Sequence, residues 1–265
     1  MDKKYTKSYS LSKEEMNGMS KRFSYATTTD KGSKIFESST TDDVYTHDDK
    51  ELDDKTNDEQ RKTNDACQNC NLSIICLSTD EQFKCAFRKC REVFYDKLLD
   101  YGASWRIMRP QSVTDQIYIK ANRIRSIEES NGVTMVNEGV LPEFIGIVNY
   151  GIIGLIQLVR GYSKDGTDMS TKEVLDLYEK YATISFELMQ KKNHDYDEAW
   201  RMMRICSYTD LILMKICRTK SIESNNGKTK VSEGIDANYL DMINYAIFGI
   251  IKLLEEEETV NDEKK

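Results

Sequence analysis

The strongest constraint on this fold is an internal repeat with a spacing of 95 residues. When the chain is shifted by 95 positions, residues 100–158 align with residues 195–253 without a gap, and 27 of the 59 pairs are identical. Chance at ordinary composition would give about four identities. One structural unit therefore occurs twice in tandem, and the fold must accommodate two equivalent units.

Both copies have the same order of helical patterns. A Ser-x-x-Glu capping pattern at Ser78 or Ser170 begins a first helix, which runs to Asp100 or Asp195. Apolar residues at helical spacing predict a second helix from about 112 or 207, with Asp115 or Asp210 in its first turn, and a third helix over 142–159 or 237–254. No strand pattern of comparable length appears, so the predicted class is all-α with six main helices.

Two three-helix units make a better core together than apart. Three helices of this size bury little surface, so we expect the copies to pack about a pseudo-twofold axis, like a homodimer fused into one chain. The predicted parts are a disordered Ser/Thr-rich tail (1–77), two helical repeats (78–160 and 161–254) and a charged C-terminal tail (255–265). A monomer of this pseudo-dimeric form and a true homodimer both remain open.

Composition narrows the class of protein and its cellular compartment, but it indicates no reaction. There is no uninterrupted apolar run of eighteen residues, so no membrane span is expected. A net charge of −7 disfavours binding of a nucleic-acid backbone over a large part of the surface. Seven cysteines without a secretory signal indicate free thiols in the cytoplasm. Zinc binding stays an alternative for the cysteines near the start of the first repeat, which are Cys67, Cys70, Cys76, Cys85 and Cys90.

Cations recur at equivalent positions of the two copies. A Lys-x-x-Arg pattern places two of them on one face of the second helix, and an Arg-x-x-Arg pattern lies in the preceding loop. The residues are Arg106, Arg109, Lys120, Arg123, Arg201, Arg204, Lys215 and Arg218. Arginine forks suit phosphate geometry, so these residues are candidate phosphate ligands. Ion pairs with Glu128 and Glu138 are the alternative.

Repeated aromatic and amide side chains are candidates for contacts with a base or sugar. They are Trp105, Trp200, Tyr101, Tyr196, Asn149, Asn244, Tyr150 and Tyr245. Aromatic rings beside arginine can stack on a nucleobase. A tryptophan at a helix–loop junction is also a common core residue, so packing is the alternative for Trp105 and Trp200.

Acidic residues near these cations are candidate ligands for Mg²⁺, which prefers hard oxygen donors. They are Asp100, Asp195, Glu138, Glu233 and Asp241. Asp241 lies on an apolar helix, where a carboxylate needs a metal, a hydrogen bond or a cationic partner. Copy one has Gly146 at that position, and Glu143, one turn earlier, partly substitutes for it. The alternative is an Asp241 neutralised by a lysine or arginine.

These motifs resemble a known family. The segment Asp100–Arg106, the Lys-x-x-Arg helix and the segment Asp241–Tyr245 are similar to nucleotide modification associated domain 1, formerly a domain of unknown function. The resemblance covers about residues 80–254. It implies an all-α domain that acts in nucleotide or nucleic-acid base modification, by a chemistry that the family leaves unassigned. The pairing of acidic and basic helices is also similar to MazG-like nucleotide pyrophosphohydrolases, but their Glu-x-x-Glu pattern is missing from the first helices.

Two function hypotheses follow. In the first, the chain binds a nucleotide or nucleic-acid base through its basic helix face, with Mg²⁺ as a possible cofactor. An enzyme of this kind would be a metal-dependent nucleotide hydrolase or a nucleotide-modifying protein. In the second, the chain is a non-enzymatic helical scaffold, with its charges in internal ion pairs and its tail as a docking arm.

Overall fold

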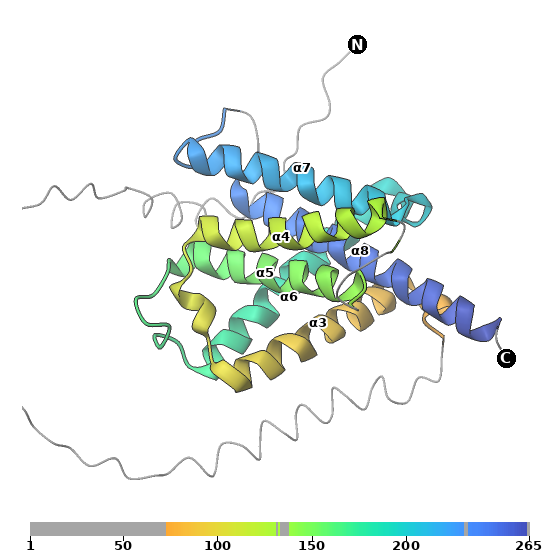
Figure 1. Cartoon of the computed structure of the whole chain (residues 1–265), viewed down its shortest axis with the longest axis horizontal. Helices are drawn as coiled ribbons and strands as arrows, with labels where there is room; N and C mark the ends of the chain where they lie inside the picture. Colours follow the sequence, from red (N-terminus) through yellow and green to blue (C-terminus); the bar gives the residue numbers. More distant parts are fainter. Residues whose placement is uncertain (1–72, 131, 133–137, 231–232, 264–265) are drawn as a thin grey trace, which may run out of the picture. The chain divides into compact units, whose positions relative to one another are not determined.

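The computed structural model describes residues 73–130, 132, 138–230 and 233–263. This part of the chain contains six α-helices and no strand (Figure 1). The α-helices are α3 (Thr79–Tyr101), α4 (Pro110–Glu129), α5 (Leu141–Arg160), α6 (Thr171–Tyr196), α7 (Ile205–Ser224) and α8 (Ile235–Asp262). Three short 3-10 helices are η1 (Ile74–Cys76), η2 (Ser104–Ile107) and η3 (Ala199–Met202). The predicted all-α class is confirmed.

The first helix of each copy begins where its cap predicts. Ser78 is the N-cap of α3, and its hydroxyl and the Glu81 carboxylate satisfy each other's backbone N–H groups in a full capping box. Ser170 caps α6 by accepting the N–H of Glu173 at 3.2 Å. Each cap satisfies an N–H group that has no partner within the helix.

The second helix of each copy begins about two residues before its predicted start. Pro110 opens α4, where its missing N–H costs nothing, and Ile205 opens α7. Asp115 and Asp210 therefore lie in the second turn and outside the reach of the helix N-terminus, so their predicted first-turn role is wrong. Their carboxylates form ion pairs between the two copies.

Reciprocal contacts between α4 and α7 show the pseudo-twofold relation. Thr114 donates to Glu223 at 2.7 Å, and its counterpart Thr209 donates to Glu128 at 2.9 Å. Two ion pairs repeat the relation, Asp115–Lys220 at 2.7 Å and Asp210–Arg125. Because the start of each helix meets the end of the other, α4 and α7 run antiparallel, as Figure 1 shows. Burial raises the pKa of the Glu128 and Glu223 carboxyls.

The third helices cross at the centre through glycines. A Cβ atom on Gly154 of α5 would lie 2.7 Å from the Tyr239 ring of α8, and a Cβ atom on Gly249 would lie 2.9 Å from the Phe144 ring. These two contacts are related by the 95-residue shift. Each glycine leaves the space that an aromatic ring of the other copy fills, so the two copies share one core.

α5 and α8 are the most deeply buried helices of the bundle. Phe144, Ile147 and Ile152 of α5, together with Ile243 and Ile250 of α8, are fully buried. α5 is long and apolar enough to cross a membrane, but 72% of that window is buried inside the protein. Its apolarity therefore fits a central core helix.

Both ends of the helical body extend beyond their predicted bounds. Ile74 is buried before α3, and its backbone N–H donates to Glu258 at 3.1 Å. Gln82 donates to Glu255 at 2.8 Å and to the Ile74 carbonyl at 2.8 Å. Residues 255–262 are thus the last turns of α8, held against η1 and α3, and the prediction that they form a tail is wrong. The rest of the predicted N-terminal tail, residues 1–72, lies outside the described residues.

Candidate functional site

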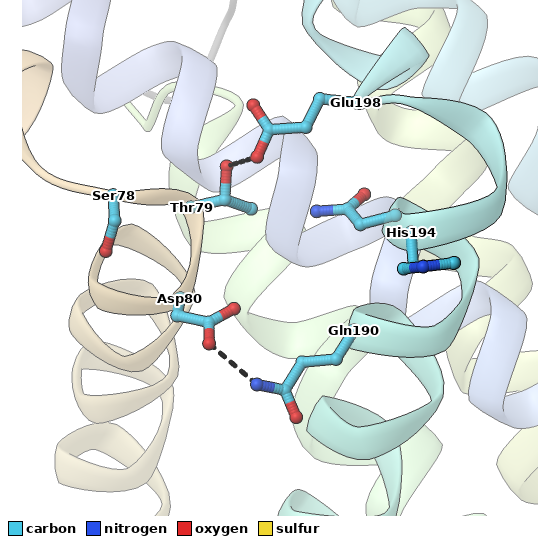
Figure 2. Close-up of a pocket in the computed structure, with 7 residues that line it drawn as sticks. Ser78, Thr79, Asp80, Gln190, His194 and Glu198 are labelled. Atoms are coloured by element: carbon cyan, nitrogen blue, oxygen red, sulfur yellow. Dashed lines mark hydrogen bonds between the residues drawn. The ribbon is translucent and has the colours of Figure 1, made fainter.

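An open hollow lies between the start of α3 and the end of α6 (Figure 2). Its lining residues are Ser78, Thr79, Asp80, Gln190, Asn193, His194 and Glu198. Gln190 donates to Asp80 at 2.6 Å, and Thr79 donates to Glu198. Hydrogen bonds from Thr79 and Arg201 hold the pKa of Glu198 below its usual range. None of the residues predicted to bind a ligand lines this hollow, and its polar groups fasten α6 to α3.

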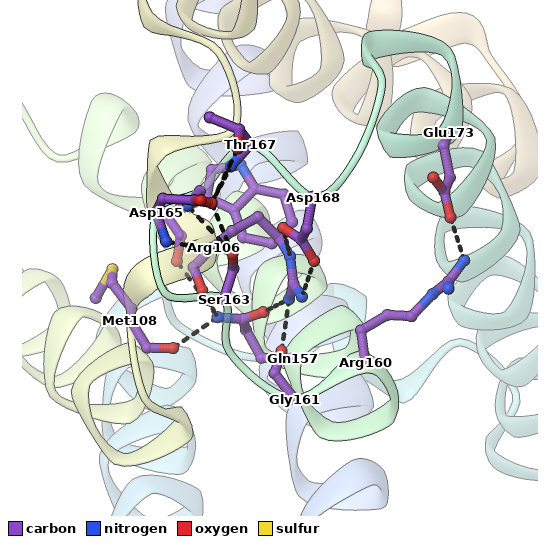
Figure 3. Close-up of polar contacts among 12 residues, drawn as sticks. Arg106, Met108, Gln157, Arg160, Gly161, Ser163, Asp165, Thr167, Asp168 and Glu173 are labelled. Carbon is purple, nitrogen blue, oxygen red and sulfur yellow. Dashed lines mark hydrogen bonds and ion pairs between the residues drawn. The ribbon is translucent and has the colours of Figure 1, made fainter. Parts of the chain in front are cut away.

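Arg106 is buried in a network of its own (Figure 3). Its Nε and Nη2 atoms donate to the two carboxylate oxygens of Asp168 at 3.2 and 2.8 Å. Its Nη1 donates to the Gly161 carbonyl at 2.6 Å and to Gln157. The hydrogen bonds from Arg106 lower the pKa of Asp168. Arg106 therefore fixes the loop after α5 onto η2, which favours a structural role over the predicted binding of phosphate.

Arg201, the counterpart of Arg106, also makes contacts within the fold. Its Nε donates to Glu198 at 2.5 Å, and its Nη2 donates to Gln82 at 3.0 Å. Lys252, which replaces Gln157, donates to the Arg201 carbonyl at 2.8 Å. Both copies thus use an arginine to fasten the 3-10 helix to neighbouring elements, which argues against a phosphate-binding role for Arg201.

Both tryptophans are buried core residues. Trp105 and Trp200 are 9% and 5% exposed. The Trp200 ring stacks on Phe248 with centroids 4.4 Å apart and planes inclined by 8°, and the Arg201 guanidinium lies 4.4 Å from the ring centroid. Their rings already have partners within the protein, which favours packing over the predicted nucleobase stacking.

Arg109 and Arg204 face solvent just before α4 and α7. Each occupies the N-cap position in an extended conformation, and each is exposed. Within the described residues neither side chain makes a hydrogen bond or an ion pair. They are free to meet an anion, and their predicted role in phosphate binding stays a prediction.

The remaining predicted residues gather into two equivalent polar clusters. Each contains the Lys-x-x-Arg pair of the second helix, a tyrosine from the end of the first helix, a tyrosine and a carboxylate from the third helix, and a glutamate from the connector. Cluster one comprises Tyr101, Lys120, Arg123, Glu138, Glu143 and Tyr150, and cluster two comprises Lys192, Tyr196, Lys215, Arg218, Glu233, Asp241 and Tyr245.

The cations of cluster one are paired with carboxylates. Glu143 is 4% exposed, and its two oxygens bind Arg123 at 2.6 Å and Lys120 at 3.3 Å. Arg123 also binds the exposed Glu138 at 2.9 Å, and these contacts raise the pKa of Arg123. The structure therefore supports the salt-bridge alternative for Lys120 and Arg123.

Cluster two is built around a buried carboxylate. Asp241 is 5% exposed, and its Oδ2 binds Lys215 at 2.5 Å while its Oδ1 binds Lys192. Lys215 is itself buried, whereas the Lys192 side chain is 44% exposed. Arg218 makes no hydrogen bond or ion pair with any described residue. Cluster two thus retains a half-buried arginine without a partner.

The four tyrosines of the clusters are exposed or half-buried. Tyr101 and Tyr196 are 55% and 70% exposed, and Tyr150 and Tyr245 are half-buried. Burial raises the pKa of Tyr245 to about 12, and nearby charges on Asp241 and Glu233 reinforce the shift. Burial likewise raises the pKa of Tyr150 and of Tyr101. The hydroxyls of Tyr101, Tyr150 and Tyr245 are therefore neutral donors at physiological pH, and the exposed rings of Tyr101 and Tyr196 are open to a ligand.

The repeated asparagines belong to the core. Asn149 accepts from the Tyr178 hydroxyl at 2.8 Å and donates to the Cys90 carbonyl at 3.0 Å. Asn244 accepts from Ser185 at 2.6 Å, and Ser185 is the counterpart of Cys90. These bonds hold the first helices against the third helices, so both asparagines have a structural role that competes with the predicted ligand contacts.

The predicted metal ligands do not converge. Asp241 binds two lysines, and Glu138 binds Arg123. Asp195 is exposed beside His194, at 3.3 Å from its ring nitrogen. No three His, Cys, Asp or Glu side chains in the described part of the chain come close enough to hold a metal ion. The described residues therefore offer no site with three such ligands, and the predicted binding of Mg²⁺, which one or two carboxylates can hold together with substrate phosphates, stays a prediction.

The cysteines were the other candidate metal ligands. Cys67 and Cys70 lie outside the described residues. Cys76, Cys85 and Cys90 belong to η1 and α3, with Cys76 exposed and Cys90 buried. Burial raises the pKa of the Cys90 thiol, so its protonated form is favoured. A buried neutral thiol is a poor zinc ligand, which disfavours Cys90 in such a site.

The fold and clusters together define a class: an all-α pseudo-dimer in one chain, with a polar cluster of Lys, Arg, acidic and Tyr side chains in each half. The model of a protein family described as nucleotide modification associated domain 1 matches the chain twice, at residues 97–158 and 192–253. The chain therefore carries two tandem copies of this domain. No curated protein and no solved structure matches it significantly.

Some site residues were not predicted from the sequence. Lys192 pairs with Asp241, and it is identical to its counterpart Lys97, three residues before the aligned segment begins. Both lysines fall inside the family match, so extending the repeat toward the N-terminus would have found them. Gln157 and Asp168 had no such signal, because neither is repeated and their role depends on a loop packing against η2.

Proposed function

We propose that this protein binds a nucleotide at cluster two. The observation that carries the proposal is the pairing pattern of its cations: Arg218 forms no hydrogen bond or ion pair with any described residue, whereas Lys192, whose side chain is 44% exposed, pairs with Asp241. A half-buried guanidinium without a counter-ion is unfavourable, and a phosphate supplies the missing charge in a matching geometry. Membership of the nucleotide modification associated domain 1 family supports the same ligand class.

The tyrosines supply the second half of such a site. The Tyr196 ring is 70% exposed and offers a flat apolar face for a nucleobase, while the Tyr245 hydroxyl is a neutral donor. We assign no reaction step to these residues. A cytoplasmic location fits the five free cysteines in the described residues.

A helical scaffold is the competing function. It is favoured by Arg106, Arg123 and Arg201, whose guanidinium groups are already bound within the fold. In a scaffold, Arg218 would have no ligand and its removal would leave every binding property unchanged.

Calorimetric titration distinguishes the two functions. We expect nucleoside monophosphates to bind the full chain, and Arg218→Gln to weaken binding at least tenfold, since a charge-assisted phosphate contact is lost. Lys220→Gln is the matched control, because Lys220 lies on the same helix and pairs with Asp115 instead. Titrations with and without Mg²⁺ test the metal separately. Absence of binding by every nucleotide would refute the proposal in favour of the scaffold.

A further inference from the structure

The two clusters differ in the place of one carboxylate. In copy one, Glu143 on α5 binds both Lys120 and Arg123. The equivalent residue on α8 is Asn238, and the carboxylate has moved one helical turn to Asp241. The chain therefore keeps one buried carboxylate for each Lys-x-x-Arg pair but places it differently along the third helix.

The two carboxylate positions go with different paths of the lysine side chain. A Cβ atom on Gly146, the counterpart of Asp241, would lie 2.4 Å from Cε of Lys120. In copy one the lysine passes over this glycine to reach Glu143. In copy two the Asp241 side chain occupies that path, and it binds Lys215 at 2.5 Å. The lysine is thus satisfied in both copies, and only the arginine loses its buried partner.

The position vacated by the carboxylate contains an unsatisfied acceptor. Asn238 is completely buried, and its Nδ2 donates to the Gly234 carbonyl at 2.7 Å. Its Oδ1 has no hydrogen-bond partner in the described structure. Exchanging the two amide atoms would set two oxygens against each other at Gly234, so the orphaned atom is the oxygen. A buried acceptor without a donor costs about 1–3 kcal/mol.

We infer that cluster two is the single ligand site of the chain and that Glu143 closes the equivalent site in copy one. This inference rests on the proposed function. The Glu143 carboxylate occupies, beside Arg123, the place that a ligand takes beside Arg218. A ligand that fits has a phosphate for Arg218, and a nucleoside monophosphate supplies one.

Exchanging the carboxylate positions tests this inference. Asn238→Glu with Asp241→Gly gives copy two the arrangement of copy one, so Lys215 keeps a partner and Arg218 gains one. The reverse exchange, Glu143→Asn with Gly146→Asp, is combined with Glu138→Gln to open copy one, because Glu138 would otherwise still pair with Arg123. Because each variant keeps one buried carboxylate beside its Lys-x-x-Arg pair, both are expected to fold.

The stoichiometry of binding is measured by calorimetry with AMP, CMP, GMP and UMP, and with inorganic phosphate for comparison. We expect one molecule per wild-type chain, at least tenfold weaker binding after closing copy two, and two molecules per chain after opening copy one. Inorganic phosphate should bind more weakly, because it lacks the sugar and base.

Each other outcome has a distinct meaning. Two equivalent sites in the wild type would overturn the inference and leave nucleotide binding intact. Unchanged affinity after closing copy two, in a variant whose circular dichroism shows a folded chain, would also overturn it. No binding by the wild type would overturn the inference and the proposed function together.

Discussion

The buried Lys215–Asp241 pair allows a quantitative test of the core of copy two. We expect Asp241→Asn to destabilise the fold strongly, because it leaves the Lys215 ammonium without a counter-charge. The side chains of Lys215 and Asp241 are only 7% and 6% exposed. Removing one partner of such a buried pair costs about 3–5 kcal/mol. For a helical body of this size, about 2–4 °C per kcal/mol gives a fall in Tm of about 6–20 °C.

The matched control is Asp210→Asn on α7. Asp210 also forms an ion pair, with Arg125, but its side chain is 66% exposed. A surface pair of this kind contributes less than about 1 kcal/mol, so the same chemical change should lower Tm by only a few degrees. Thermal unfolding followed by circular dichroism at 222 nm measures both variants. If Asp241→Asn and Asp210→Asn lower Tm equally, burial does not determine the strength of these pairs and the reasoning is refuted.

Two further predictions concern the contacts between the copies. Gly154→Ala and Gly249→Ala should each lower the free energy of unfolding by about 1–3 kcal/mol in urea titrations, since the new methyl overlaps an aromatic ring. Gly139→Ala is the control, because a Cβ atom there would have no neighbour within 4 Å. Equal losses at all three positions would contradict the glycine crossing. Burial raises the pKa of Glu223, so its charged form destabilises the fold as pH rises through that pKa. The free energy of unfolding of Glu223→Gln should therefore exceed that of the wild type at pH 7. This difference should shrink below about pH 4, under the ordinary glutamate pKa, where the wild-type carboxyl is protonated in both states. A difference that grows toward low pH would contradict the predicted direction of the pH dependence.

The fold was largely predictable from the repeat and the helix caps. Ser78 and Ser170 mark their helix starts because capping is a local interaction between residues three apart. The pseudo-twofold bundle follows from the duplication, since two units too small for separate cores must share one. The ends were misjudged at Ile74 and at residues 255–262, where charged residues are helical because Gln82 and the Ile74 backbone bind Glu255 and Glu258 across the bundle.

The candidate site was only partly predictable. Repetition of Lys120 and Arg123 in Lys215 and Arg218 indicated positions where a cation is needed, but an identical cation can serve different partners. Arg106 and Trp105 illustrate this limit, because both are repeated and both proved to be core residues. A repeat reports that a side chain has a role, and the role itself depends on neighbours that are distant in sequence.

There is a physical reason why the sequence predicted some features of this protein and only the tertiary structure determined others. Helix starts, apolar faces and the duplication depend on local sequence and periodicity, so they could be determined without coordinates. Whether Arg123 and Arg218 are paired depends on a carboxylate supplied by another helix, at Glu143 in one copy and one turn along at Asp241 in the other. Only the tertiary structure, which sets the distances between α4 and α5 and between α7 and α8, shows that Arg123 is paired with Glu143 and that Arg218 forms no ion pair with a described carboxylate.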